Sequence, residues 1–281
     1  MKLYNDYKTI WSAQNNTLDT LYQYIRGYHW GMDDFGNIVA TNTDKQDVPA
    51  FCCHLDTVHK KAPEVENING VLLAFNGTGV GGDDKCGIVA CLEMLKRVPC
   101  TCIFFREEEK GCIGSKHFDT DIIKENLFLI EIDRRGNSDL IFKSGLDILC
   151  SNNFAAEVKK HFKGYYEAQG LYTDVNVLGK AEINMMNVSA GYFNPHSNKE
   201  YVVLKDLERT IKNLTSFAKN YKTKEKYVII VKNPKPKPET QTTLTYNGIT
   251  WGQRIEQEDD SLLDYMRKLN GYDEGDDCSG Y

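Results

Sequence analysis

The 281-residue sequence lacks the features of a membrane or secreted protein. No apolar run approaches the roughly 20 residues of a membrane-spanning helix, so we expect no membrane partner. The first residues, Met1 to Asp6, contain no apolar segment of the signal-peptide type, which predicts that the chain carries no secretion signal. Its nine cysteines are odd in number and form no C-x-x-C pair. Buried, reduced thiols in a cytoplasmic protein therefore fit better than a disulfide scaffold.

The sequence also has no excess of basic residues over acidic ones. The net charge is −6, and lysine and arginine are dispersed along the chain. This distribution predicts no nucleic-acid partner. Much of the acidic excess falls in the C-terminal segment, and its acidity favours exposure. Three alternatives stay open for that segment: packing onto the core, contact with a neighbouring protein or subunit, or an unstructured exposed chain. The oligomeric state is equally open.

Apolar runs of strand length alternate with segments of helical periodicity. Strands are predicted near 38–40, 49–53, 71–75, 101–105 and 127–132, and helices near 4–28, 83–95 and 204–222. The alternation predicts an α/β domain, with helices on both faces of a mostly parallel central sheet. Ligand sites in such sheets lie beyond the carboxyl ends of the strands.

A proline- and lysine-rich stretch, Pro234 to Pro238, interrupts this pattern and favours extended polyproline geometry. We therefore predict a catalytic domain over residues 1–231, a linker over 232–240 and an acidic tail over 241–281. One short helix is plausible in the tail, near 262–269.

Five histidine and acidic signatures lie along the predicted domain, mostly at the ends of apolar runs. They are His54-Leu55-Asp56, Asp83-Asp84-Lys85, Glu108-Glu109-Lys110-Gly111, Asp133 and His196. Together they supply two imidazoles and at least three carboxylates. Two divalent cations that share one bridging carboxylate need such a set. The set predicts a dinuclear metal hydrolase that acts on an amide bond.

Each signature alone also has an ordinary explanation. His54 suits a satisfied core histidine, and Asp83-Asp84 suits the acidic first turn of a capped helix. The triplet Glu107-Glu108-Glu109 suits a solvated charge run. However, it follows an apolar strand directly, and like charges there raise one another's pKa unless a cation compensates them.

Two other features point away from the metal site. Gly77-x-Gly79-x-x-Gly82 matches a dinucleotide-binding fingerprint, but the two aspartates that follow would repel a pyrophosphate. The remaining histidines are expected to be ordinary surface or core residues: His29, His59, His117 and His161.

In their order, the signatures resemble the co-catalytic zinc exopeptidases, a group that includes peptidase T, carboxypeptidase G and the zinc aminopeptidases. The resemblance runs from about Asp33 to Lys222. It implies two zinc ions, which Co²⁺ or Mn²⁺ could replace. The implied metal ligands are His54, Asp83, Glu109, Asp133 and His196.

The resemblance also implies a role for each residue. Asp83 would bridge the two ions. His54 and Asp133 would complete the ligands of one ion, and Glu109 and His196 those of the other. Glu108 would be the general base, and Asp56 would lie behind His54.

The chain departs from the family pattern at two places. Glu107 stands where the family usually has an aspartate before its glutamate pair. The interval from Asp133 to His196 is too short for the lid domain that the peptidase T and carboxypeptidase G branch inserts there. We therefore expect a lidless, single-domain relative that is nearer the zinc aminopeptidases in architecture.

The predicted activity is hydrolysis of a peptide bond by a zinc-activated water, as in an aminopeptidase on short peptides. Two alternatives remain: an amide hydrolase on a non-peptide N-acyl substrate, and a catalytically inactive, metal-stabilised binding protein.

Overall fold

The computed structural model describes residues 2–231, 243–246 and 249–252. The chain divides into two compact units, Met1–Lys232 and Asn233–Tyr281. The described part of the second unit is an antiparallel hairpin of β15 (Thr243–Tyr246) and β16 (Ile249–Gly252). The linker predicted over 232–240 and the helix near 262–269 lie outside the described residues, so the proposed domain boundaries stay predictions.

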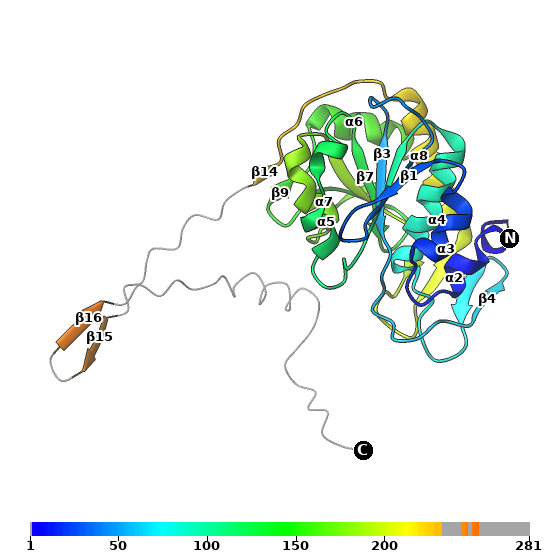
Figure 1. Ribbon diagram of the computed structural model, residues 1–281, viewed down its shortest axis with the longest axis horizontal. Coiled ribbons are helices and arrows are strands. Elements are labelled where there is room, and N and C mark those ends of the chain that lie inside the picture. Colours follow the sequence, from blue (N-terminus) through cyan, green and yellow to red (C-terminus); the bar gives the residue numbers. More distant parts are fainter. Residues whose placement is uncertain (1, 232–242, 247–248, 253–281) are drawn as a thin grey trace, which may run out of the picture. The chain divides into compact units, whose positions relative to one another are not determined.

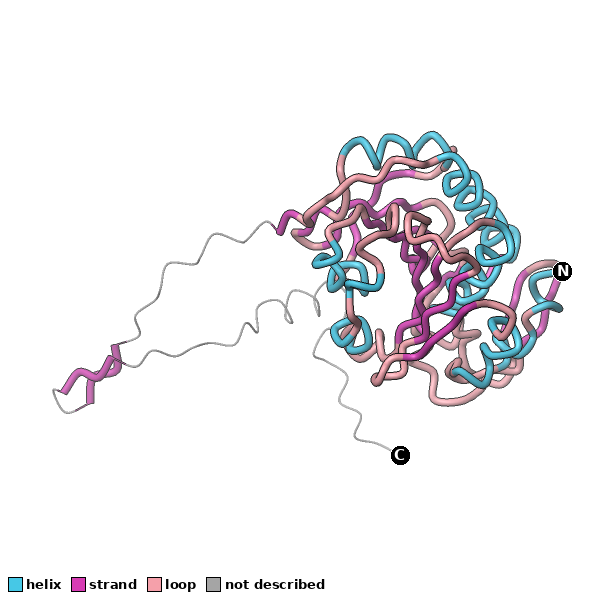
Figure 2. The backbone as a smooth tube through the Cα atoms, turned by 45° about the horizontal axis from the view of Figure 1, so that its top comes forward, coloured by secondary structure: helices cyan, strands magenta, loops and turns pink. Residues whose placement is uncertain are grey.

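A ten-stranded sheet forms the centre of the first unit (Figures 1 and 2). Its middle strands run parallel in the order β6 (Thr101–Phe105), β3 (Ala50–His54), β7 (Leu129–Arg134) and β11 (Met185–Ser189). Each is buried along nearly its whole length, as expected for parallel strands covered on both faces.

Antiparallel strands extend the sheet at both edges. β2 (Ile38–Thr41) and β1 (His29–Met32) follow β6 on one side. On the other side β11 is followed by β8 (Asp139–Ser144), β9 (Asp147–Ile148) and β14 (Ile230–Val231), and β10 (Tyr166–Gly170) pairs in parallel with β8.

Helices cover both faces of the sheet. Successive side chains of a strand point to opposite faces, so an apolar strand needs cover on both. Phe51 and Cys53 belong to the core under α4, α6 and α8, whereas Ala50 and Cys52 belong to a second core under Val175 of α7. The bounds on the first face are α1 (Lys2–Asp6), α2 (Lys8–Ser12), α3 (Leu18–Ile25), α4 (Gly82–Arg97), α6 (Asn152–His161) and α8 (Leu204–Asn220). Those on the second are α5 (Ile113–His117), η1 (Thr120–Ile122), α7 (Asp174–Val177) and η2 (Leu178–Ala181).

This arrangement confirms the predicted three-layer α/β/α fold with a mostly parallel central sheet. Between Asp133 and His196 the chain forms strands of the same sheet together with α6, α7 and β12. Consequently the described part of the chain carries no lid domain, as predicted.

The strand predicted near 71–75 lies in a separate, four-stranded antiparallel sheet. The order there is β12 (Tyr192–Phe193), β13 (Tyr201–Val203), β5 (Val71–Ala74) and β4 (Val65–Ile68). Asn69 and Gly70 join β4 to β5, and both have positive φ. A two-residue turn of this kind closes a hairpin, which explains why β5 pairs with β4.

The N-terminal segment differs from the single helix predicted near 4–28. It forms three short helices, α1 to α3, with a break over residues 13–17. Thr17 begins α3 with a capping box, in which the Thr17 N–H donates to Thr20 Oγ1 at 2.8 Å. In the break the Asn16 N–H donates to the carbonyl of Leu55. The break therefore brings the N-terminal segment to the loop that follows β3.

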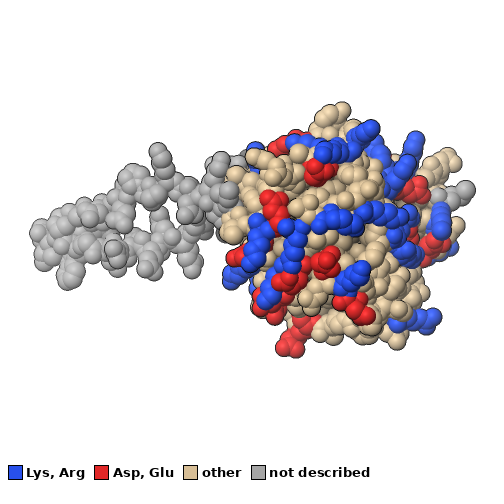
Figure 3. Space-filling model, turned by 90° about the horizontal axis from the view of Figure 1, so that it is seen from above, with Lys and Arg blue, Asp and Glu red and all other residues tan. Residues whose placement is uncertain are grey.

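The described residues also bear on two simpler expectations. No helix among them is long and apolar enough to cross a membrane. Their eight cysteines are all buried free thiols, as predicted. On the face seen in Figure 3, lysine and arginine side chains lie among aspartates and glutamates.

Candidate active site

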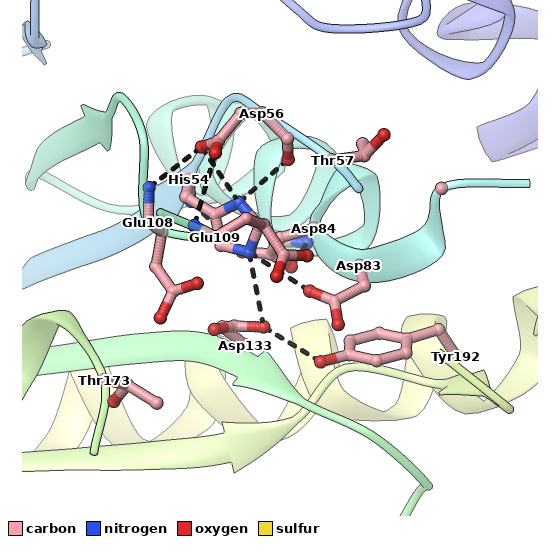
Figure 4. A network of polar contacts seen from close by, with 12 residues as sticks. His54, Asp56, Thr57, Asp83, Asp84, Glu108, Glu109, Asp133, Thr173 and Tyr192 are labelled. Atoms are coloured by element: carbon pink, nitrogen blue, oxygen red, sulfur yellow. Dashed lines mark hydrogen bonds and ion pairs between the residues drawn. The ribbon is translucent and has the colours of Figure 1, made fainter. Parts of the chain in front are cut away.

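All the predicted site residues meet beyond the carboxyl ends of β3 and β7, and Figure 4 shows all of them except His196 by label. His54 ends β3, and Asp133 lies near the end of the neighbouring parallel strand β7. Asp83 precedes the regular part of α4, since Asp83 and Asp84 have non-helical backbone angles. The remaining residues come from loops: Asp56 after β3, Glu108 and Glu109 after β6, and His196 between β12 and β13.

The two carboxylate oxygens of Asp83 face two different imidazoles. Asp83 Oδ1 lies 3.1 Å from His54 Nε2, and Asp83 Oδ2 lies 3.2 Å from His196 Nε2. His54 Nε2 is also 3.8 Å from Asp133 Oδ1, and His196 Nε2 is 3.1 Å from Glu109 Oε1. Asp83 thus stands between two groups of nitrogen and oxygen donors.

These donors fit a metal centre. In two sets, His54–Glu108–Asp133 and His54–Asp83–Glu109, one donor atom of each residue lies within 4.8 Å of the others. Glu109 Oε1 is buried and makes no hydrogen bond of acceptable geometry, so it retains a free lone pair. Imidazole nitrogens and carboxylate oxygens are the donors that zinc accepts in catalytic sites.

The charges of the site also indicate that it binds cations. Asp83 and Asp133 are each only 9% exposed. Burial raises the pKa of Asp133 well above its usual range, and the charges of Asp83 and Asp84 add to this effect. The carboxylates of Asp83 and Glu109, which lie beside its Nε2, raise the pKa of His196 to about 10. So many buried acids require compensating cations, which protonated imidazoles or metal ions can provide.

Glu108 has the environment of a proton acceptor. Burial raises its pKa to about 8, the nearby imidazole of His54 opposes that shift, and the charge of Asp174 reinforces it. The thiol of Cys112 donates to Glu108 Oε1 at 3.5 Å. Glu107 behaves differently: it has a positive φ and pairs with Lys110 at 3.2 Å.

Asp56 lies behind His54 and makes further contacts that the sequence did not indicate (Figure 4). Its carboxylate is 3.5 Å from His54 Nδ1, and the same nitrogen is 2.9 Å from the Asp56 carbonyl. It also accepts the backbone N–H groups of Glu108 at 3.0 Å and Glu109 at 3.2 Å. One side chain therefore orients the imidazole and holds the glutamate loop.

Sequence reasoning missed two residues that support Asp133. The Tyr192 hydroxyl donates to Asp133 Oδ1 at 2.9 Å (Figure 4). Asn187 accepts the Asp133 N–H and donates to its carbonyl, both at 3.0 Å. A polar residue inside the apolar strand Met185–Ser189 was the available signal, because buried polar groups need partners.

Asp84 turns away from the site and accepts the N–H groups of His54 and Gly87.

A cavity of about 400 Å³ borders the site at Asp56 and Glu109. It lies between the break before α3 and the loops after β3 and β6. The other lining residues are Asn15, Asn16, Thr17, Leu55, Thr57, Val58, Arg106, Glu107 and Lys110. Most of the lining residues are polar or charged, and the charged ones are of both signs.

Comparison with known protein families shows to which family this chain belongs. The model of the family described as "Peptidase family M28" matches residues 37–187, more than half of the chain. The chain belongs to peptidase family M28. The match confirms the predicted relationship to the dinuclear zinc exopeptidases, and M28 membership supports metal-dependent peptide hydrolysis. The matched range contains His54, Asp83, Glu108, Glu109 and Asp133 but ends before His196.

Solved structures agree with this M28 peptidase in fold. The aminopeptidase PepT from Bacillus cereus and a tripeptidase from Staphylococcus aureus each superpose with a TM-score of 0.65 at 14% identity, over 77% of this chain and 97% of theirs. The TET1 peptidase of Pyrococcus horikoshii gives 0.61 at 14% identity, over 77% of this chain and 99% of its own. At such identities the likeness concerns the fold alone. No curated protein matches the chain by sequence.

Proposed function

We propose that this M28 peptidase is a dinuclear zinc aminopeptidase that acts on short peptides. The observation that carries the proposal is the position of Asp83, whose two oxygens face His54 and His196 separately. A carboxylate placed in this way suits a bridge between two ions. His54 and Asp133 would complete one set of ligands, and Glu109 and His196 the other.

Bound zinc ions would supply an activated water and stabilise the negative charge that develops on the substrate oxygen. Glu108 accepts the proton as the water attacks the carbonyl and then delivers it to the leaving amine. Asp56 keeps Glu108 in place through its backbone N–H, so it acts on the reaction by positioning.

Two features support a short peptide as the substrate. The described chain has no lid over the site, and the cavity of about 400 Å³ beside Asp56 and Glu109 is of the size that small ligands occupy. In addition, the structures with the same fold include proteins described as an aminopeptidase and a tripeptidase.

The first test is the metal content of protein purified without chelator, together with hydrolysis of short peptides that have free or blocked amino termini. We expect about two zinc ions per chain and cleavage that requires a free amino terminus. Two ions with cleavage of N-acyl amino acids alone would favour the non-peptide amide hydrolase. Two ions without hydrolysis of either substrate class would favour the inactive binding protein, and failure to take up added zinc would refute the metal site.

A further inference from the structure

Glu200 is a fully buried carboxylate that the proposed chemistry does not use. It lies four residues after His196, in the loop between β12 and β13. Its Oε2 accepts the Gly81 N–H at 2.7 Å, and its Oε1 accepts the Asp83 N–H at 3.0 Å. Its third partner is His59 Nε2, 2.7 Å from Oε2. Because an ionised carboxylate only accepts, this nitrogen carries the hydrogen.

The loop that these hydrogen bonds hold has almost no free space around it. A Cβ atom added to Gly79 would lie 2.4 Å from His59 Nε2 and 2.5 Å from the Ser197 carbonyl oxygen. One added to Gly82 would lie 2.7 Å from atoms of Tyr192 and Val202. The glycines therefore let the backbone approach closely enough for its N–H groups to reach Glu200.

His59 is itself fixed from two directions. Its backbone N–H donates to Thr57 Oγ1 at 3.1 Å, and its carbonyl accepts from Gln14 Nε2 at 3.1 Å. The imidazole thus connects Glu200 to the N-terminal segment and to the loop after β3. In the sequence this histidine looked ordinary, since its partner lies 141 residues away.

The loop between β12 and β13 therefore does two things. It presents His196 to Asp83 Oδ2, and through Glu200 it holds the backbone of Asp83. We propose that Glu200, locked by His59, is a positioning residue that sets Asp83 relative to His196, so that binding of the second metal ion depends on it. The second ion is the one assigned to Asp83, Glu109 and His196, and the inference rests on the proposed two-ion site.

The first ion also uses Asp83 but should depend less on Glu200. His54 and Asp133 sit on adjacent parallel strands, and both have supports of their own. Replacing Glu200 by glutamine keeps the side-chain volume. The amide, however, has one acceptor oxygen, whereas both carboxylate oxygens of Glu200 accept hydrogen bonds. The new NH₂ group would then face an N–H donor. Loss of an outer partner of this kind typically lowers metal affinity by about 10–100-fold.

The test is a zinc titration of metal-free protein, followed by calorimetry, that resolves the first and second binding events. The variants are Glu200→Gln and His59→Ala, with the exposed Glu208→Gln and His117→Ala as matched controls. We expect a second-site affinity about 10–100-fold lower in Glu200→Gln, a smaller loss in His59→Ala, and little change in the first site or in the controls.

Equal second-site affinities in wild type and Glu200→Gln would overturn the inference and leave the two-ion proposal intact. If Glu200→Gln does not fold by circular dichroism, His59→Ala decides: an unchanged second-site affinity refutes the role of the pair. Uptake of fewer than two ions by the wild-type protein would instead refute the two-ion site, and this inference with it.

Discussion

Three adjacent glutamates occupy three different environments, so replacing each by glutamine in turn separates their roles. Glu107 pairs with Lys110 near the surface. Glu108 is the half-buried carboxylate assigned as general base, and Glu109 lies 3.1 Å from His196. Glutamine has nearly the same volume as glutamate. The three substitutions therefore change charge and hydrogen bonding without opening a cavity in the site.

The expected magnitudes differ widely. Glu107→Gln removes one surface ion pair, worth about 0–1 kcal/mol, and should leave kcat and metal content unchanged. Glu108→Gln should lower kcat by about 10²–10⁴-fold, or roughly 2.7–5.4 kcal/mol, with both ions retained. Glu109→Gln should lower the affinity for one ion by at least the roughly 10–100-fold typical of outer partners.

The assay combines peptide hydrolysis under saturating substrate with metal content after gel filtration, and circular dichroism verifies folding. Glu107→Gln is the matched control, since it changes the same residue type in the same loop. The reasoning would be refuted if Glu107→Gln lost activity as Glu108→Gln does. Retention of full activity by Glu108→Gln would remove the proposed base.

Three further predictions concern the surroundings of the site and the fold. Tyr192→Phe removes the hydroxyl that supports Asp133 and should lower kcat/KM by about 10-fold in steady-state kinetics. Zinc chelation should abolish hydrolysis and lower Tm in a melting experiment, because ions that bind only the folded state stabilise it; added zinc should restore both. Glu93→Gln should reduce the free energy of unfolding at pH 7 by roughly 1.5–3 kcal/mol in urea titrations, because Glu93 accepts hydrogen bonds from Tyr7 and Arg97. Burial raises the pKa of the Glu93 carboxyl, but those hydrogen bonds bring it below its usual value. Its contribution is thus complete above the ordinary carboxyl pKa of about 4.3 and should disappear as the pH falls through the lowered value.

For each of these three predictions, one outcome would contradict it. Unchanged kinetics in Tyr192→Phe would show that Asp133 needs no hydroxyl support. A Tm that does not respond to chelation would argue against metal bound in the folded state. A stability difference for Glu93→Gln that does not shrink at all as the pH is lowered towards acid unfolding would show that the glutamate charge is not its cause.

Local sequence determined much of the fold and the composition of the site. Apolar runs such as 101–105 and 127–132 became buried parallel strands, because only a strand covered on both faces accommodates continuous apolar side chains. Since parallel strands end at one edge, His54 and Asp133 had to lie close together. The order of the signatures was enough to predict the family relationship.

One prediction was wrong because turn chemistry outweighed periodicity. The helix predicted near 4–28 breaks where Asn15, Asn16 and Thr17 bond to nearby groups, and Thr17 caps a new helix. The strand predicted near 71–75 is confirmed, and it pairs outside the central sheet because Asn69-Gly70 turns it back on β4. The Thr17 cap and the Asn69-Gly70 turn are local signals in the sequence, whereas Asn15 and Asn16 bond to Thr57 and Leu55 in the loop after β3.

Other features of the site were decided only by tertiary structure. Asp56 reaches the Glu108 N–H across 52 residues, Tyr192 reaches Asp133 across 59, and Glu200 reaches the Asp83 N–H across 117. No local pattern marks such pairs, because a buried hydrogen bond depends on which loops the sheet order brings together. The sequence by itself thus specified which groups can bind metal and at which sheet edge they gather. Long-range packing decided their orientation, since buried polar groups take whatever partners the folded chain places within reach.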